Sequence, residues 1–260
     1  MPANYTFTKG TSPIVVTAIH DGHQIRADLR GLSNLTDSER LREEDPFTAR
    51  WLNASDSRIT VHKSRFEVDV NRSRDKAVYI VPEDAWGLKL WKQKLPDDVA
   101  LASLQVYDSF YEECERYFDD LFALNEKIIV LDIHSYNHRR DSREVEADPA
   151  ENPEINIGTK NMDRELWNPV VTTLIEQFSS FDYDGRKLDV RENVKFKGGY
   201  FGQWLYDRYE SNICPISIEF KKFFMDEWTG EAFEEDILLI NQMIQLSKEP
   251  LLEALERIHV

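Results

Sequence analysis

Cysteine is nearly absent from this 260-residue sequence, which contains only Cys114 and Cys214. The two residues lie far apart and show no motif spacing, which argues against a disulfide framework and against a cysteine-based zinc cluster. We therefore expect both to be reduced structural thiols in the protein core.

Long apolar runs and an excess of positive charge are also missing. No run of about 18 apolar residues occurs, and the chain does not start with a basic region followed by an apolar stretch. We therefore expect a soluble, cytoplasmic protein without a membrane partner. Acidic residues outnumber basic ones by 48 to 32, and the net charge of −16 would repel phosphates, which argues against nucleic acid as a partner.

What the sequence does contain predicts an α/β fold. Its length and its 41% hydrophobic content allow a large core, and no repeat or interdomain linker divides the chain, so we expect a single domain over residues 1–260. The run Ile128-Ile129-Val130-Leu131 is typical of a strand buried on both faces. Similar runs at 13–19 and 215–218, with amphipathic helices over 101–124 and 233–258, predict a mixed, mostly parallel central sheet with helices on both faces.

The remaining segments are less regular. Alternation over residues 58–72 predicts one or two half-buried strands. We expect a loop with a short helix over 24–45, a helix at 47–52, and loop-rich segments over 73–100 and 138–156, the second of them beside the cleft. A short strand at 155–159 and helices at about 163–178 and 203–210 complete the expected elements.

Two histidines follow directly on apolar strands. His20 ends the run 13–19 and His134 ends the run 128–131, where ligands bind in open α/β sheets. Two imidazoles at separate strand ends, with carboxylates nearby, indicate a catalytic divalent metal site with three protein ligands and one open position. The third ligand is His23, Glu44 or Asp45, and the residue pattern leaves these three alternatives open.

Other polar residues suggest acid–base chemistry and anion binding. Glu219 follows the apolar run 215–218, where burial would raise its pKa and suit it to act as a general base. The alternative is a structural salt bridge to a nearby lysine or arginine. Arg65, Asn71 and Arg72 form a basic cluster that could hold one or two substrate carboxylates, with a solvated strand face as the alternative.

Several motifs occur in a characteristic order along most of the chain, from about residue 13 to 230. The more specific ones are Val68-Asp69-Val70-Asn71-Arg72 and Asp132-Ile133-His134-Ser135. The others are Pro13-Ile14-Val15-Val16 leading to His20-Asp21-Gly22, then Glu44-Asp45, Ser64-Arg65-Phe66-Glu67, Gly198-Gly199, Ile218-Glu219 and Met225-Asp226-Glu227. In this order the sequence resembles the N-formylglutamate amidohydrolase family, which is related to the zinc carboxypeptidases.

The resemblance implies a phosphorylase/hydrolase-like α/β fold and the cleavage of a formyl group from an acidic amino acid such as N-formyl-L-glutamate, a reaction of histidine degradation. It implies zinc as the cofactor, His20 and His134 as ligands together with Glu44 or Asp45, Asn71 and Arg72 as carboxylate binders, and Glu219 as the base. One departure is His23, which stands where the carboxypeptidases have a glutamate three residues after their first histidine.

Two other functions fit the same residues. The first is a carboxypeptidase, or a deacylase for another N-acyl amino acid, on the same scaffold. The second is a small-ligand-binding protein without catalysis, against which the joint presence of His20, His134 and Glu219 argues. The oligomeric state is not indicated by the sequence.

Overall fold

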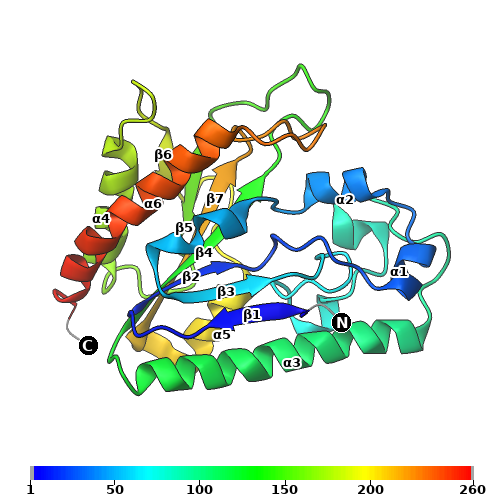
Figure 1. Ribbon diagram of the computed structural model, residues 1–260, viewed down its shortest axis with the longest axis horizontal. Helices are drawn as coiled ribbons and strands as arrows, with labels where there is room; N and C mark the ends of the chain where they lie inside the picture. The colour runs from blue at the N-terminus through cyan, green and yellow to red at the C-terminus, as the bar shows by residue number, and fades with distance from the viewer. Residues whose placement is uncertain (1–2, 259–260) are drawn as a thin grey trace.

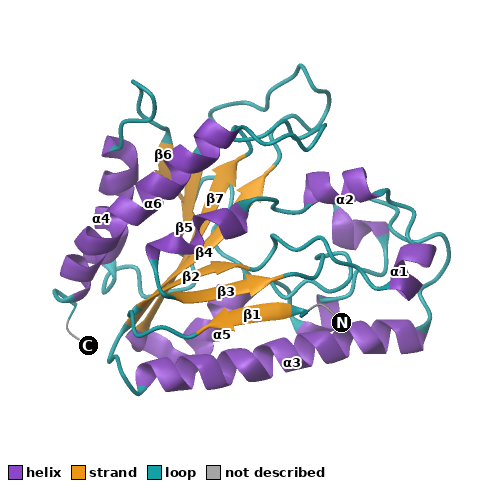
Figure 2. Cartoon of the chain, in the orientation of Figure 1, coloured by secondary structure: helices purple, strands orange, loops and turns teal. Residues whose placement is uncertain are grey.

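A seven-stranded mixed sheet forms the centre of the computed structural model, which describes residues 3–258 (Figure 1, Figure 2). Its strand order is β1-β3-β2-β4-β7-β5-β6. β1 pairs antiparallel with β3, and β5 pairs antiparallel with β7. The other four described strand pairs are parallel. The strands are β1 Tyr5–Thr8, β2 Ile14–Ala18, β3 Ser57–Val61, β4 Ile128–Tyr136, β5 Ile155–Gly158, β6 Val190–Glu192 and β7 Ile213–Lys221. The expected α/β fold with a mostly parallel sheet is confirmed.

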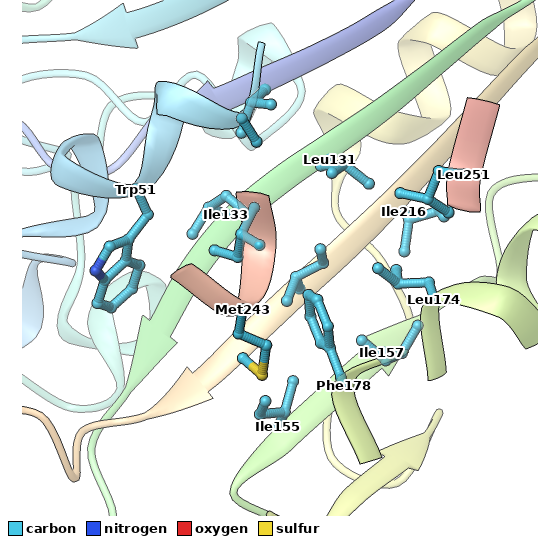
Figure 3. Close-up of a cluster of buried hydrophobic side chains, with 14 of the residues drawn as sticks. Trp51, Leu131, Ile133, Ile155, Ile157, Leu174, Phe178, Ile216, Met243 and Leu251 are labelled. Carbon is cyan, nitrogen blue, oxygen red and sulfur yellow. The ribbon is translucent and has the colours of Figure 1, made fainter. Parts of the chain in front are cut away.

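Helices cover both faces of this sheet, as expected (Figure 2). One face packs against α3 (Asp97–Phe122) and α5 (Tyr200–Tyr209). The other packs against α4 (Asn168–Ser180), α6 (Glu234–Leu255) and a 3₁₀ helix, Thr48–Ala54, and Figure 3 shows the side chains of this second core. The short helices α1 (Ala27–Leu32) and α2 (Asp37–Glu43) lie beyond the end toward which β2 and β3 point (Figure 1). No helix among residues 3–258 is long and apolar enough to cross a membrane.

The two-residue period of the central strands separates apolar from polar side chains. In β4, Ile129, Leu131 and Ile133 enter the core under α4 and α6. Successive side chains point to opposite faces, so Asp132 and His134 lie on the other face, at the end of the strand. Their neighbours across the parallel ladder are Ser217 and Glu219 of β7. The pleat therefore places a row of polar groups at the carboxyl ends of two buried strands.

Several expectations about the elements were wrong. Of the one or two half-buried strands expected over 58–72, one is present as β3, but residues 66–70 are not a strand, although Phe66, Val68 and Val70 are buried. The backbone turns there, with the amide of Glu67 donating to the carbonyl of Ser64 (2.9 Å), so the alternation came from turns and not from a pleat. Other differences concern boundaries: the long helix starts at Asp97 after Pro96, the helix expected at 47–52 is the 3₁₀ helix, and β1 and β6 were not expected.

Other expectations are confirmed. Residues 73–100 are mainly loops, and they contribute to a small apolar cluster separate from the two main cores, while residues 24–45 contain two short helices where one was expected. Both cysteines are buried free thiols. All strands within residues 3–258 belong to one sheet. Residues 1–2 and 259–260 of the expected single domain lie outside the part of the chain that the structure describes.

Trp51 gives a test of this packing. It is fully buried, its ring centroid lies 5.0 Å from that of Phe220 and 4.8 Å from that of Phe224, and its Nε1 donates to the carbonyl of Ile237 (3.1 Å). We expect Trp51→Ala to lower the free energy of unfolding by about 3–5 kcal/mol, because the substitution leaves a large cavity. Urea denaturation would measure this, with Leu246→Ala at an exposed position as a control that changes stability by less than about 0.5 kcal/mol.

Candidate metal centre and active site

A cavity of about 290 Å³ opens at the carboxyl ends of β2, β4 and β7. The residues that the sequence singled out converge on it from separate segments, and seven of them line its wall: His20, Asp45, Arg65, Asn71, Arg72, His134 and Glu219. Glu44 is not among the lining residues. The position matches the crevice outside the strand ends where open α/β sheets bind ligands.

His20, Asp45 and His134 form a group with the composition of a metal site. Their ligand atoms lie within 4.8 Å of one another, and all three residues are buried. Nδ1 of His134 lies 3.0 Å from Oδ2 of Asp45, and Nδ1 of His20 lies 3.5 Å from the same oxygen. Donors bound to one zinc ion with tetrahedral geometry are separated by roughly 3.3 Å. The spacing of the three residues therefore fits a single divalent ion.

The far side of each imidazole is held by a second carboxylate. Nε2 of His20 donates to Oδ1 of Asp69 (2.7 Å), and Nε2 of His134 donates to Oδ2 of Asp132 (2.9 Å). Asp132 in turn accepts a hydrogen bond from the hydroxyl of Thr17 on β2 (2.5 Å). This arrangement leaves Nδ1 of both rings turned toward Asp45, and carboxylate–histidine pairs of this kind orient the histidine ligands of metal sites.

The charge of these groups also suits a cation. Burial alone would lower the pKa of His134, but Asp132 and Glu219 outweigh it and raise that pKa well above its usual value. Burial by itself would raise the pKa of Asp45, whereas hydrogen bonds from His134 and His20 lower it below the usual range. The negative potential that favours a proton on the imidazole also favours a metal ion in its place. The residues present thus fit a divalent metal.

Glu44, offered by the sequence as an alternative ligand, has its carboxylate elsewhere. It lies 3.3 Å from the guanidinium of Arg40 and 2.5 Å from Nδ1 of His23, and it accepts a hydrogen bond from the hydroxyl of Ser64. These contacts direct the carboxylates of Glu44 and Asp45 to different environments, and they engage His23 as well. Of the three alternatives, only Asp45 joins the two histidines.

Lys222 fixes the segment that carries Asp45. Its Nζ is buried and donates to the carbonyls of Arg42 (2.6 Å) and Glu44 (2.7 Å), where α2 ends. A cation at a helix carboxyl end complements the helix dipole. Burial lowers the pKa of Lys222 to about 8. Because Lys222 follows β7 directly, it ties the strand of Glu219 to the segment of Asp45.

Glu219 lies beside His134 in the ladder and lines the cavity. The hydroxyl of Ser217 donates to its Oε1 (3.3 Å), and no salt bridge joins Glu219 to a basic side chain within residues 3–258. Burial raises the pKa of Glu219 to about 7. A carboxylate with such a pKa at a cavity wall can both accept and return a proton near neutral pH.

The basic cluster occupies the adjoining wall. Arg65 donates to Oδ2 of Asp69 (3.0 Å), whereas Arg72 is one-third exposed and donates to the carbonyl of Asp84 (3.2 Å). Oδ1 of Asn71 accepts from the amide of Phe201 (2.9 Å). Gly199 permits this approach, since a Cβ there would lie 2.2 Å from Oδ1 of Asn71. Arg72 thus keeps donors free toward the cavity, while Arg65 is largely engaged.

Some residues of the site were missed by the sequence reasoning. The role of Asp132 could have been found, because it lies two residues before His134 and shares its face of the strand. Asp69 belongs to a recognised motif, but nothing local indicates its contact with His20, 49 residues away. Lys222, Trp86 and Arg140 also line the cavity, and no residue pattern points to them.

Comparison with known proteins identifies a family and a fold for the chain. The family model for N-formylglutamate amidohydrolase matches residues 12–225 of the chain. None of the curated proteins shows a significant match to it. Among solved structures, the N-formylglutamate amidohydrolase from Ralstonia eutropha JMP134 has a TM-score of 0.73 at 17% identity, with 99% of each chain covered.

Two further structures extend the comparison. The gene product Atu2144 from Agrobacterium tumefaciens has a TM-score of 0.68 at 17% identity and covers 98% of this chain and 97% of its own. A metallo-carboxypeptidase from Burkholderia cenocepacia covers 95% of this chain and 57% of its own at 12% identity, with a TM-score of only 0.37. The first two likenesses show a common fold over the whole chain.

Proposed function

The chain belongs to the N-formylglutamate amidohydrolase family, and on this premise we propose that it hydrolyses N-formyl-L-glutamate to formate and glutamate with the help of a divalent metal. The observation that carries the proposal is the conjunction, in one cavity, of the His20–Asp45–His134 group with Glu219 on the adjacent strand. A cytoplasmic role in histidine degradation is part of the same proposal.

His20, Asp45 and His134 would hold the metal, and a set of two imidazoles and one carboxylate favours zinc. When bound, such an ion polarises a carbonyl group and stabilises negative charge on its oxygen. Asp69 and Asp132 keep both imidazoles in the orientation that turns Nδ1 toward Asp45. Both histidines then act as neutral ligands, because each donates its other N–H to a carboxylate.

Glu219 would perform the proton transfers. Its carboxylate takes a proton from the water that attacks the formyl carbon and passes it to the amide nitrogen as the C–N bond breaks. The products are formate and the free amino group of glutamate, so a single carboxyl group serves as base and then as acid. Glu219, whose pKa burial raises to about 7, would be ionised for the first step once a cation occupied the adjacent site.

The charges of the cavity favour an anionic substrate. Among residues 3–258, four basic side chains line the cavity: Arg65, Arg72, Arg140 and Lys222. Four carboxylates, those of Glu43, Asp45, Asp69 and Glu219, also line it. A fifth carboxylate, that of Asp132, holds His134 from the other side, so a divalent ion added to this set leaves one net positive charge, which favours an anionic substrate such as an N-acyl acidic amino acid. Arg72 and Asn71 would bind its α-carboxylate, with Arg65 beside them.

Metal content and formate release test the proposal together. We expect near-stoichiometric zinc in protein purified without added metal, and formate release from N-formyl-L-glutamate that chelation abolishes and zinc restores. Elemental analysis and an enzymatic formate assay measure both quantities.

Three other outcomes would contradict parts of the proposal. Metal without formate release would refute the substrate, and activity on N-acetyl-L-glutamate or on a dipeptide with C-terminal glutamate would then indicate a deacylase or carboxypeptidase. Formate release that chelation leaves unchanged would refute the metal. Neither metal nor turnover after zinc is added back would favour a binding protein without catalysis.

A further inference from the structure

Arg140 is a basic residue of the cavity with no task in the mechanism so far. It belongs to the loop of residues 138–154, and with Asn137 it lines both the catalytic cavity and an adjoining cavity of about 110 Å³ beneath that loop. The loop thus contributes a cation to a site whose other charged groups lie on or near the strand ends. A ligand that fills the catalytic cavity would meet Arg140 at the junction of the two cavities.

The backbone that carries Arg140 is firmly held. The amides of His138 (3.1 Å) and Arg139 both donate to the carboxylate of Glu227, which is buried. The guanidinium of Arg42 donates to the carbonyls of Arg139 (3.0 Å) and Arg140 (3.3 Å). Arg140 is therefore anchored at the base of the loop, whereas residues 141–151 are mostly exposed.

The guanidinium of Arg140 is oriented but not saturated. Its NH2 lies 3.1 Å from Oε2 of Glu43 and its NH1 lies 3.5 Å from Oε1, so this carboxylate engages one edge of the group. A guanidinium has five N–H donors, and the remaining ones stay available. Its carbon lies 5.9 Å from the ring centroid of Trp86, over which Arg65 also lies at 4.8 Å. One indole ring thus lies near two cations of the same cavity.

Asn137 adds a polar group that the protein leaves without a partner. The residue is only 3% exposed, and its Oδ1 has no hydrogen-bond partner among the described residues. A buried acceptor of this kind is uncommon in a folded protein and calls for a donor from a ligand or water, whereas Nδ2 of the same amide group can donate to a carboxylate. Its position beside Arg140 marks this end of the cavity as built for a polar group.

We propose that Arg140, with Asn137 beside it, forms the subsite for the side-chain carboxylate of the substrate, and that this subsite makes the enzyme prefer acidic over neutral N-formyl amino acids. The inference rests on the proposed function, since it assumes that Asn71 and Arg72 take the α-carboxylate. Glu43 then has the task of holding the guanidinium in place, and the carboxylate of the ligand pairs with the donors that Glu43 leaves free.

The test compares N-formyl-L-glutamate with its neutral isostere N-formyl-L-glutamine in wild type and Arg140→Gln. We expect Arg140→Gln to lower kcat/KM for N-formyl-L-glutamate about 10- to 100-fold and to change kcat/KM for N-formyl-L-glutamine less than about threefold, since only the first substrate loses a charged partner. Arg143→Gln is the matched control, because Arg143 lies in the same loop, is exposed, and pairs with Asp226 away from the cavity. Zinc content and the thermal midpoint verify that each variant is folded.

An equal loss with both substrates, or no loss with either, would overturn the subsite. If wild type releases formate from neither substrate, the proposed function fails, and calorimetric titration of glutarate into zinc-loaded protein decides the subsite separately. A roughly tenfold weaker affinity for glutarate in Arg140→Gln, with Arg143→Gln unchanged, would support it. Unchanged affinity in Arg140→Gln, or no binding of glutarate to wild type, would refute it.

Discussion

Replacement of Glu219 by glutamine is expected to lower kcat for formate release by about 10²–10⁴-fold while zinc binding stays intact. The amide has the shape of the carboxyl group but cannot take the proton of the attacking water or return it to the amide nitrogen. Because Glu219 lines the cavity and is not one of the three residues grouped as ligands, the metal should remain. Steady-state formate assays and elemental analysis of the same preparation give both quantities.

The expected pattern separates a base from a structural residue. KM for N-formyl-L-glutamate should change little, since the substrate carboxylates bind elsewhere in the cavity. Glu249→Gln, on the exposed side of α6, serves as the control and should leave kcat unchanged. If Glu219→Gln kept a kcat close to that of wild type, another group would have to be the base, and the proposed proton path would be wrong.

Asp45→Asn and Glu44→Gln should affect different properties, although the residues are adjacent. In Asp45→Asn the group of His20, His134 and Asp45 loses its only negative ligand, so we expect zinc affinity to fall more than about 100-fold, beyond the range that loss of an outer partner causes. Formate release at limiting zinc should disappear with it. Competition with a chromophoric chelator measures the dissociation constant.

Glu44→Gln should leave zinc affinity within about tenfold of wild type and instead destabilise the fold. The carboxylate of Glu44 pairs with Arg40, which is 1% exposed, so its loss leaves a buried charge less well compensated. The expected loss in the free energy of unfolding is about 1–3 kcal/mol, measured by urea denaturation of the zinc-free proteins. Loss of zinc affinity in Glu44→Gln with retention in Asp45→Asn would reverse the ligand assignment.

The elements that the sequence predicted well are those whose character depends on local pattern. β4 and β7 each begin with an apolar run, Ile128–Leu131 and Ile213–Ile216, and any parallel sheet covered on both faces must bury such runs. The aromatic stripe of α3, from Tyr107 to Phe118, follows from helical spacing alone. The position of His20 and His134 at strand ends was visible for the same reason, since a polar residue that ends a buried run marks the rim of the sheet.

The segment 64–72 shows where local pattern fails. Val68 and Val70 alternate with polar residues as in a strand, and both are buried, but the hydroxyl of Ser64 and the carboxylate of Asp69 accept backbone hydrogen bonds there. Polar side chains that bond nearby amides replace the ladder and let the chain turn. The same turns place Asp69 against His20, so the error in secondary structure concealed the hydrogen-bond partner of this histidine.

By itself, then, the sequence determined the α/β class, the central strands and the two histidines, because hydrophobic periodicity acts within one element. The position of Asp45, and not of Glu44, beside the two histidines, the contacts of Asp69 and Asp132 with the imidazoles, and the entry of Arg140 into the cavity depend on the tertiary structure alone. Each depends on groups far apart in the chain. Lys222, for example, donates to the carbonyl of Glu44 just after α2, although the two residues are 178 positions apart. Hydrogen bonds and charges at such separations are set by how the elements pack, and no local spacing of residues encodes them.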